Sequence, residues 1–153
     1  MRLPENVYKF FVKQGYVIVS TLDEKGGIHC SAKGIVGIEA EGKVFIIDLY
    51  HHSTYHNLLK NNLVSITAVN EKEFTGYTLQ GTAKIIPRED IQDHIVAKWE
   101  DAIIARISNR VQNSIQAGKK SDTHHEAHLP YHPKYLIEID VENIIDLTPP
   151  DKR

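Results

Sequence analysis

The sequence predicts a mainly β protein of the α+β class, built on an antiparallel barrel that is closed or partly closed. Six or seven segments rich in β-branched residues are joined mostly by short turns, which is typical of antiparallel hairpins. Only one long helical pattern occurs, and it comes late in the chain. Because a parallel sheet would need several crossover helices, these observations favour a barrel over a doubly wound sheet.

The N-terminal third predicts a short helix followed by a three-stranded meander. Pro4 suits the first turn of a helix, and apolar residues follow it at helical spacing until Gly15. The β-branched and apolar runs that come next are separated by glycine-containing turns, which are typical of hairpins. Strands are expected over 16–22, 28–39 and 43–49.

The middle of the chain predicts a short helix and two further strands. The helix begins near Ser53 and ends at the asparagines 61–62, which favour helix ends. Strands are expected over 63–69 and 74–86. Within the second of them, Gly76 and Gly81 indicate bulges or sites where two backbones approach closely.

One long amphipathic helix is predicted between 88 and about 116. Its apolar residues recur at steps of four, which places them on one stripe: Ile91, Ile95, Trp99, Ile103, Ile107, Val111 and Ile115. A polar segment over 118–133 is expected to be a loop, and 134–149 to form one bent strand or two short ones. We therefore expect a single domain over 1–153, with 88–133 as a helix-and-loop insertion.

Composition excludes several classes of function. With 18 Lys and Arg against 20 Asp and Glu, the chain has no global attraction for nucleic acid. No apolar run approaches the roughly 20 residues that cross a bilayer. The first residues lack the apolar core of a secretion signal, so a cytoplasmic protein is expected. The single cysteine, Cys30, cannot form an internal disulfide.

Two histidine-rich segments raise the question of a metal site. In "HHSTYHN" (51–57), His52 and His56 are four residues apart and would share one face of a helix. The glutamate that accompanies such a pair in zinc hydrolases is absent. The second segment contains His124, His125, His128 and His132 with Glu126, and either chelation or a solvated loop would explain it.

The same short segment is also compatible with an anion site. A strand ends near 49, a helix begins near Ser53 or Thr54, and the first turn of a helix presents unpaired N–H groups. Hydroxyl side chains at this position cap helices, bind phosphate, or do both. Residue spacing alone favours a plain helix cap and leaves a phosphate site open.

The run from 17 to 86 resembles the core of the pyridoxamine 5′-phosphate oxidase-like, FMN-binding split-barrel family. Its landmarks occur in the family's order: "STLDEKGGIHCS" as the opening hairpin, "GKVFIID" as the third strand, "STYHNLLKNN" as the phosphate-side helix, then "VSITAV" and "LQGTAKI". This resemblance implies a split barrel that forms a homodimer, with FMN in a groove at the subunit interface.

Position by position, the resemblance also implies which residues bind the cofactor. The second strand would run along the flavin, the third would line it, and the start of the helix would meet the phosphate, while a segment near Gly76 would come from the partner. The implied cofactor-binding residues are Ser31, Ala32, Lys33, Gly34, Ile35, Val36, Ile46, Ile47, Asp48, His52, Ser53, Thr54 and Tyr77.

The chain departs from the family in two places. Family members commonly carry an Arg-Lys pair where this chain has Ser53 and Thr54, so Lys33 or the histidines 51–52 would have to serve the phosphate. Arg106 and Arg110, one helical turn apart, are either a solvated face or contacts for an anion or partner. The C-terminal segment that positions the substrate of true oxidases has no counterpart, so that activity is not expected.

The sequence thus predicts an FMN-binding oxidoreductase that transfers a hydride or electrons at the flavin, with a nicotinamide or another small molecule as electron donor. Because the flavin carries the reaction, no catalytic side chain is assigned. Trp99 is either a core residue or an aromatic wall near the flavin. Two alternatives remain open: a non-catalytic flavin-binding or sensing module, and a haem- or deazaflavin-binding relative on the same barrel.

Overall fold

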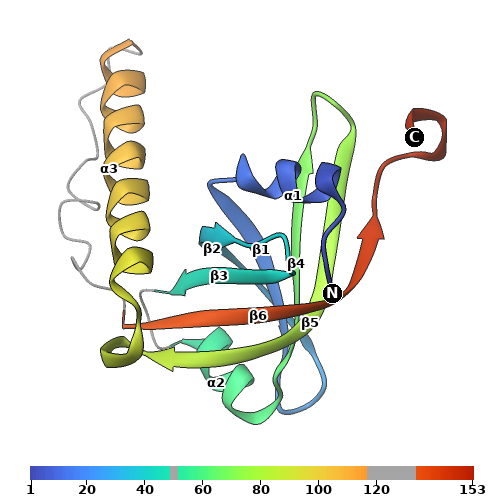
Figure 1. Cartoon of the computed structure of the whole chain (residues 1–153), viewed down its shortest axis with the longest axis vertical. Helices are drawn as coiled ribbons and strands as arrows, with labels where there is room; N and C mark the ends of the chain where they lie inside the picture. Colours follow the sequence, from blue (N-terminus) through green and yellow to red (C-terminus); the bar gives the residue numbers. More distant parts are fainter. Residues whose placement is uncertain (49–51, 117–133) are drawn as a thin grey trace.

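The computed structural model describes residues 1–48, 52–116 and 134–153, and within 106–116 it describes the side chains of Ser108, Gln112 and Ile115 only. Six antiparallel strands close into a barrel in the order β1-β2-β3-β6-β5-β4 (Figure 1). The strands are β1 (Tyr16–Leu22), β2 (Ile28–Ile38), β3 (Lys43–Asp48), β4 (Leu63–Asn70), β5 (Thr75–Pro87) and β6 (Tyr135–Asp146). The predicted mainly β split-barrel class is confirmed.

Three helices surround the barrel. Helix α1 (Glu5–Val12) begins directly after Pro4, and α2 (Ser53–Lys60) follows β3; they lie at opposite ends of the barrel (Figure 1). Helix α3 (Asp93–Gln116) stands along the side. Two 3-10 turns, η1 (Arg88–Asp90) and η2 (Pro150–Lys152), complete the elements of the described ranges. No helix within the described ranges has both the length and the apolarity needed to span a membrane.

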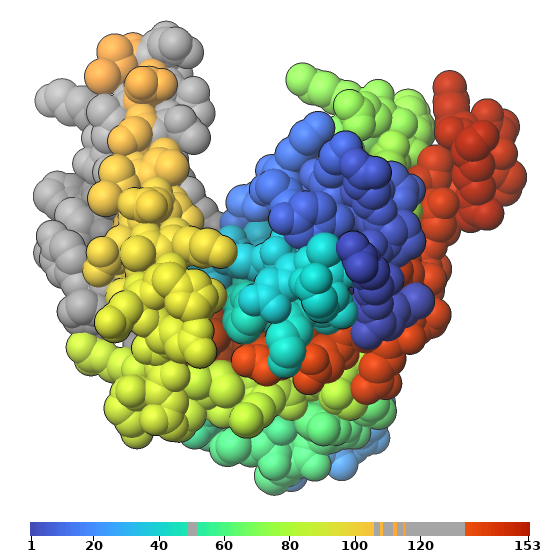
Figure 2. Space-filling view, viewed as in Figure 1, coloured from blue at the N-terminus to red at the C-terminus, as the bar shows by residue number. Residues whose placement is uncertain are grey.

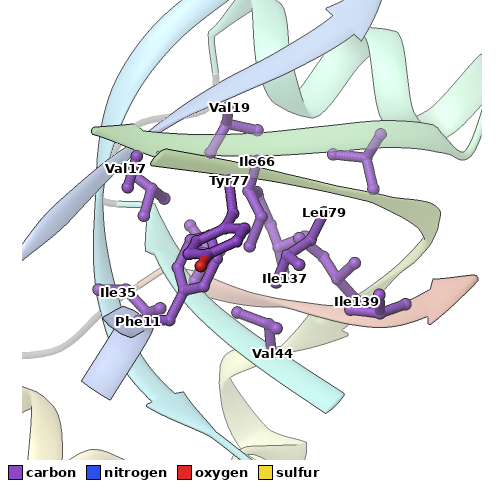
Figure 3. Close-up of a cluster of buried hydrophobic side chains, with 14 of the residues drawn as sticks. Phe11, Val17, Val19, Ile35, Val44, Ile66, Tyr77, Leu79, Ile137 and Ile139 are labelled. Atoms are coloured by element: carbon purple, nitrogen blue, oxygen red, sulfur yellow. The ribbon is translucent and has the colours of Figure 1, made fainter. Parts of the chain in front are cut away.

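The main core fills the barrel interior. Alternate residues of each strand point inward, as the period of two in a strand requires, and Figure 3 shows Val19, Ile66, Leu79, Ile137 and others meeting there. Helix α1 contributes Phe11, only 1% exposed. Burying each such side chain stabilises the fold by about 1.5–3 kcal/mol.

A second cluster attaches the start of α3 to the outside of the barrel. It consists of Ile91, Ile95 and Trp99 packed against Phe45, Ile47 and Leu136 from β3 and β6. The core role of Trp99 is thereby supported, since it is 4% exposed. Further along α3 the apolar residues lose this cover: Ile104 and Ile115 are 62% and 74% exposed.

Three details refine the sequence-based expectations. The predicted helix from 88 is split, because Ile91 has an extended backbone that ends η1 before α3 begins. The last segment is one strand, and it pairs with β5 through a bulge next to Gly81. A Cβ on Gly81 would lie 1.9 Å from the Asp140 carbonyl oxygen, so the predicted close approach of two backbones is present.

Candidate functional site

Helix α2 is fixed to the barrel by two side-chain hydrogen bonds. The buried Thr54 hydroxyl lies 3.0 Å from the hydroxyl of Ser31 on β2. One turn later, the Asn57 amide donates to the Thr21 hydroxyl of β1 at 3.0 Å. Both contacts join neutral groups, the first part-buried and the second buried, so they set the orientation of α2 without adding charge.

A charged cluster lies inside the barrel at the β3 and β6 ends nearest α2. The Lys33 ammonium is 2.9 Å from Asp48 Oδ2, and the two side chains are only 12% and 3% exposed. The Tyr135 hydroxyl donates a hydrogen bond to the same carboxylate oxygen. The ring of Tyr55 packs on that of Tyr135, with centroids 4.9 Å apart.

The electrostatics of this cluster keep Tyr135 neutral. Burial raises the pKa of the Tyr135 hydroxyl well above its ordinary value, and the hydrogen bond to Asp48 raises it further. The positive charge of Lys33 is balanced by Asp48, so the three groups together are neutral. Lys33 therefore does not offer the unbalanced positive charge that a phosphate on this side of the barrel would need.

Strand alternation divides the predicted β2 segment between two faces. Ser31, Lys33 and Ile35 point into the barrel, whereas Ala32 is exposed on its outer face and Gly34 shares that face. Val36 packs at the edge of the cluster beneath α3. The resemblance treats this segment as one wall along a flavin, whereas the structure turns Ser31, Lys33 and Ile35 inward and Ala32 and Gly34 outward.

Three further predicted residues are buried within the chain. Ile46 is fully enclosed in the barrel core, and Ile47 is covered by α3. Tyr77 points into the core (Figure 3), where its ring makes an edge contact with Phe10 and its hydroxyl accepts a hydrogen bond from Asn6. These positions give all three residues a packing role.

The start of α2 is the exposed part of the predicted phosphate site. His52 and Ser53 are both solvent-exposed, and the helix begins at Ser53 with no side-chain hydrogen bond from His52 to cap it. His51 lies outside the described residues. The structure thus separates Ser53, which is accessible to a ligand, from Thr54, whose hydroxyl faces Ser31.

The described ranges contain no preformed metal site, because no three His, Cys, Asp or Glu side chains in them lie close enough together to hold an ion. His56 is exposed on α2 and its ring contacts Tyr55. The segment with His124, His125, His128 and His132 lies outside the described residues, as does Glu126.

Sequence reasoning did not identify Tyr135 or Tyr55 as members of the cluster. Tyr135 contacts Asp48 across 87 residues of sequence, so no local spacing relates them. One signal was present: Tyr135 begins β6 in phase with Ile137 and Ile139, and the period of two places all three inside. An inward tyrosine that is buried needs a hydrogen-bond partner for its hydroxyl.

The fold and the site together define a class: small antiparallel split barrels in which a helix is joined to the β2–β3 end by side-chain contacts. The sequence model of the family described as "Pyridoxamine 5′-phosphate oxidase" matches residues 3–144. The chain therefore belongs to the pyridoxamine 5′-phosphate oxidase-like family. No curated protein matches it.

Solved structures of similar shape agree with this family. HupZ from Group A Streptococcus shares 18% identity with a TM-score of 0.63, and the alignment covers 95% of each chain. A putative pyridoxamine 5′-phosphate oxidase from Lactobacillus delbrueckii shares 13% identity, TM-score 0.62, covering 94% of this chain and 93% of its own. An F420 reductase shares 11%, TM-score 0.59, over 94% and 98%. At these low sequence identities the structural similarity establishes the fold alone.

Proposed function

We propose that this chain is a homodimeric FMN-binding flavoprotein that acts as an oxidoreductase. The observation that carries the proposal is the joining of β2, β3 and α2 at one end of the barrel, in a chain whose family is established. The Ser31 to Thr54 contact and the Lys33 to Asp48 ion pair hold these elements together. This is the unit that the resemblance assigns to the phosphate side of FMN.

The phosphate would meet the first turn of α2. Ser53 is exposed there and can donate its hydroxyl hydrogen, while the partial positive charge at the start of a helix favours an anion. The exposed imidazole of His52 adds a second donor beside it. Since Lys33 is balanced by Asp48, we propose that these groups of the α2 start, rather than Lys33, bind the phosphate.

The outer face of four neighbouring strands supports a homodimer. Alternate residues of β2, β1, β4 and β5 point outward, and none of them is charged where these four strands pair with one another; the next outward residue of β5, Lys84, pairs with β6. The surface, here called the uncharged face, comprises Ile28, Cys30, Ala32, Gly34, Tyr16, Ile18, Ser20, Leu22, Leu63, Ser65, Thr67, Val69, Gly76, Thr78, Gln80 and Thr82.

Such a face is unusual for a surface that stays in water. Ile18, Leu63 and Val69 are 37%, 51% and 65% exposed, and depletion of charge is the compositional mark of the centre of an interface. Because Ala32 and Gly34 belong to the same face, a partner seated on it would cover the outward side of β2. The dimer and the proposed cofactor groove therefore coincide.

In this function the chain's residues bind and enclose the FMN, and the FMN carries out the reaction. FMN, when bound, supplies hydride or single-electron transfer. The small residues Ala32 and Gly34 let a planar ring approach β2, and the uncharged face excludes water once a partner covers it. The electron donor in this proposal is a nicotinamide or another small molecule.

The F420 reductase of the same fold gives a second candidate, a deazaflavin in place of FMN. Purified protein distinguishes the candidates. We expect visible absorbance of an oxidised flavin, release of FMN on denaturation, and bleaching by NADH or NADPH without oxygen. Bleaching by neither nucleotide would indicate a binding module. Release of haem or F420 on denaturation would identify that group as the cofactor in place of FMN. A colourless protein that takes up no added FMN would refute the proposal.

A further inference from the structure

We propose that the groove between α1, β2 and α3 binds a small aromatic carboxylate, with Lys98 as the residue that recognises its charge. The groove has a volume of about 230 Å³ and is built entirely within one chain. Figure 2 shows the surface hollowed between α3 and the N-terminal part of the barrel. This volume is below the roughly 300–1,000 Å³ of sites for drug-sized ligands, so a ligand with one ring fits its scale.

Apolar side chains form part of the lining of the groove, and Gln14 adds a polar group. Val12 from α1 and Val36 and Ile38 from β2 line it, together with the largely buried Phe11 and Ile35. Val12 is 55% exposed at the rim. Aliphatic and aromatic walls of this kind bind the apolar body of a ligand and give it no preferred charge.

The charge preference comes from Lys98. Of the described residues that line the groove, Lys98 alone is charged, and no described side chain forms an ion pair with its exposed ammonium. Tyr8 lines the same groove, and its hydroxyl can donate a hydrogen bond. A carboxylate would meet both donors, whereas a neutral ligand would gain little from Lys98.

A glycine brings the ammonium close to the strand. Gly37 follows the register shift in β2, and a Cβ built there would lie 3.9 Å from Lys98 Nζ and 3.3 Å from the Phe45 ring. The missing side chain leaves room for the lysine to lie over the backbone. The Lys98 ammonium thus lies over the β2 backbone, beside the apolar side chains that line the groove.

The position of the groove suggests the ligand's role. Ile35 and Val36 line it, and they continue the β2 segment whose outward residues form part of the proposed cofactor groove. An aromatic acid bound here would be the second substrate of the flavoprotein. That role rests on the proposed function, but the binding itself does not, because it needs neither a partner nor FMN.

The test is a fluorine NMR titration with 4-fluorobenzoate and its neutral counterpart, 4-fluorobenzyl alcohol. We expect the wild-type chain to bind the acid more tightly than the alcohol. Lys98→Ala should lower affinity for the acid about fivefold to tenfold and leave the alcohol unchanged. Lys98→Arg should retain the affinity for the acid. Val12→Glu, which places a carboxylate at the rim, should lower this affinity by charge repulsion.

The control is Lys25→Ala, which removes an equal charge from the β1–β2 turn, outside the groove. Failure to bind the acid, equal binding of acid and alcohol, or equal losses in Lys25→Ala and Lys98→Ala would overturn the proposal. FMN affinity is measured on the same variants. Binding of the acid without FMN would reject only the flavin function, and binding of FMN without the acid would reject only the groove.

Discussion

At the scale of single residues, the Lys33, Asp48 and Tyr135 cluster shows how a charged group can sit inside a small barrel. Removing one partner of a buried ion pair leaves the other uncompensated and costs on the order of 3–5 kcal/mol. Here the Tyr135 hydroxyl gives Asp48 a second partner on the same oxygen. Loss of either charged partner is therefore costly at this end of the barrel, whereas the start of α2 lies exposed outside the cluster.

The raised pKa of Tyr135 predicts how stability changes in alkali. An unfolded tyrosine loses its proton near pH 10, whereas the folded hydroxyl holds it to higher pH, so this stabilisation is complete below about pH 10 and declines above it. Each pH unit above 10 should remove up to about 1.4 kcal/mol. Tyr135→Phe should cost about 1–3 kcal/mol at neutral pH, and this difference should shrink in alkali. Denaturant unfolding at several pH values measures the free energy of unfolding of both proteins. A difference between wild type and Tyr135→Phe that stays the same in alkali would contradict the expectation.

Ser53 and Thr54, adjacent in sequence, should respond differently to replacement by Ala. Ser53→Ala should weaken FMN binding by about 1–2 kcal/mol and leave folding unchanged, because Ser53 is exposed. Thr54→Ala should lower the free energy of unfolding by about 1–3 kcal/mol, because Ser31 loses its buried partner. Fluorescence titration and urea unfolding measure the two effects. Ser108→Ala, on the exposed side of α3, is the matched control, and unchanged FMN affinity in Ser53→Ala would remove the phosphate assignment.

Residue identities in the site were only partly predictable. Ser31, Lys33, Asp48 and Thr54 were expected near one another from the resemblance, and the structure does bring them to one end of the barrel. Their pairing was not predictable, because the expected role of Lys33 as a phosphate cation ignored a carboxylate that becomes its neighbour only when β2 and β3 pair. The contact of Tyr135 with Asp48 depends on closure of the barrel by β6.

At the scale of elements, the strands were predictable and the long helix only in part. Short antiparallel strands carry their own signals, namely β-branched runs and glycine turns, so β1 and β3 begin where expected. A period of four in α3 identifies one apolar stripe, but it does not reveal where the barrel beneath the stripe ends. Ile95 is consequently buried, whereas Ile115 is exposed.

Gly81 provides a direct test of the β5–β6 bulge. Gly81→Ala should destabilise the fold by about 1–3 kcal/mol or more, because its methyl group would collide with the Asp140 carbonyl. Gly15→Ala is the matched control, since nothing lies within 4 Å of a Cβ there, and it should stay within about 0.5 kcal/mol of wild type. Thermal or urea unfolding measures both, and equal stability of the two variants would show that the bulge tolerates a side chain.

At the scale of the whole molecule, the uncharged face should form the dimer. Val69→Lys places a charge on this face and should shift the protein toward monomer, with weaker FMN binding as a consequence. Ile104→Lys on α3 is the matched control, because the two side chains are 65% and 62% exposed. Sedimentation or light scattering reports the mass of each variant. An unchanged dimer in Val69→Lys, or equal dissociation by both variants, would contradict the assignment.

The most direct test of the central claim compares FMN with riboflavin on the cofactor-free protein. Titration followed by flavin fluorescence should give one FMN per chain, with riboflavin bound about tenfold or more weakly because it lacks the phosphate that meets Ser53 and the start of α2. Equal affinity for both flavins would contradict the phosphate site, and no uptake of FMN at all would contradict the flavoprotein itself.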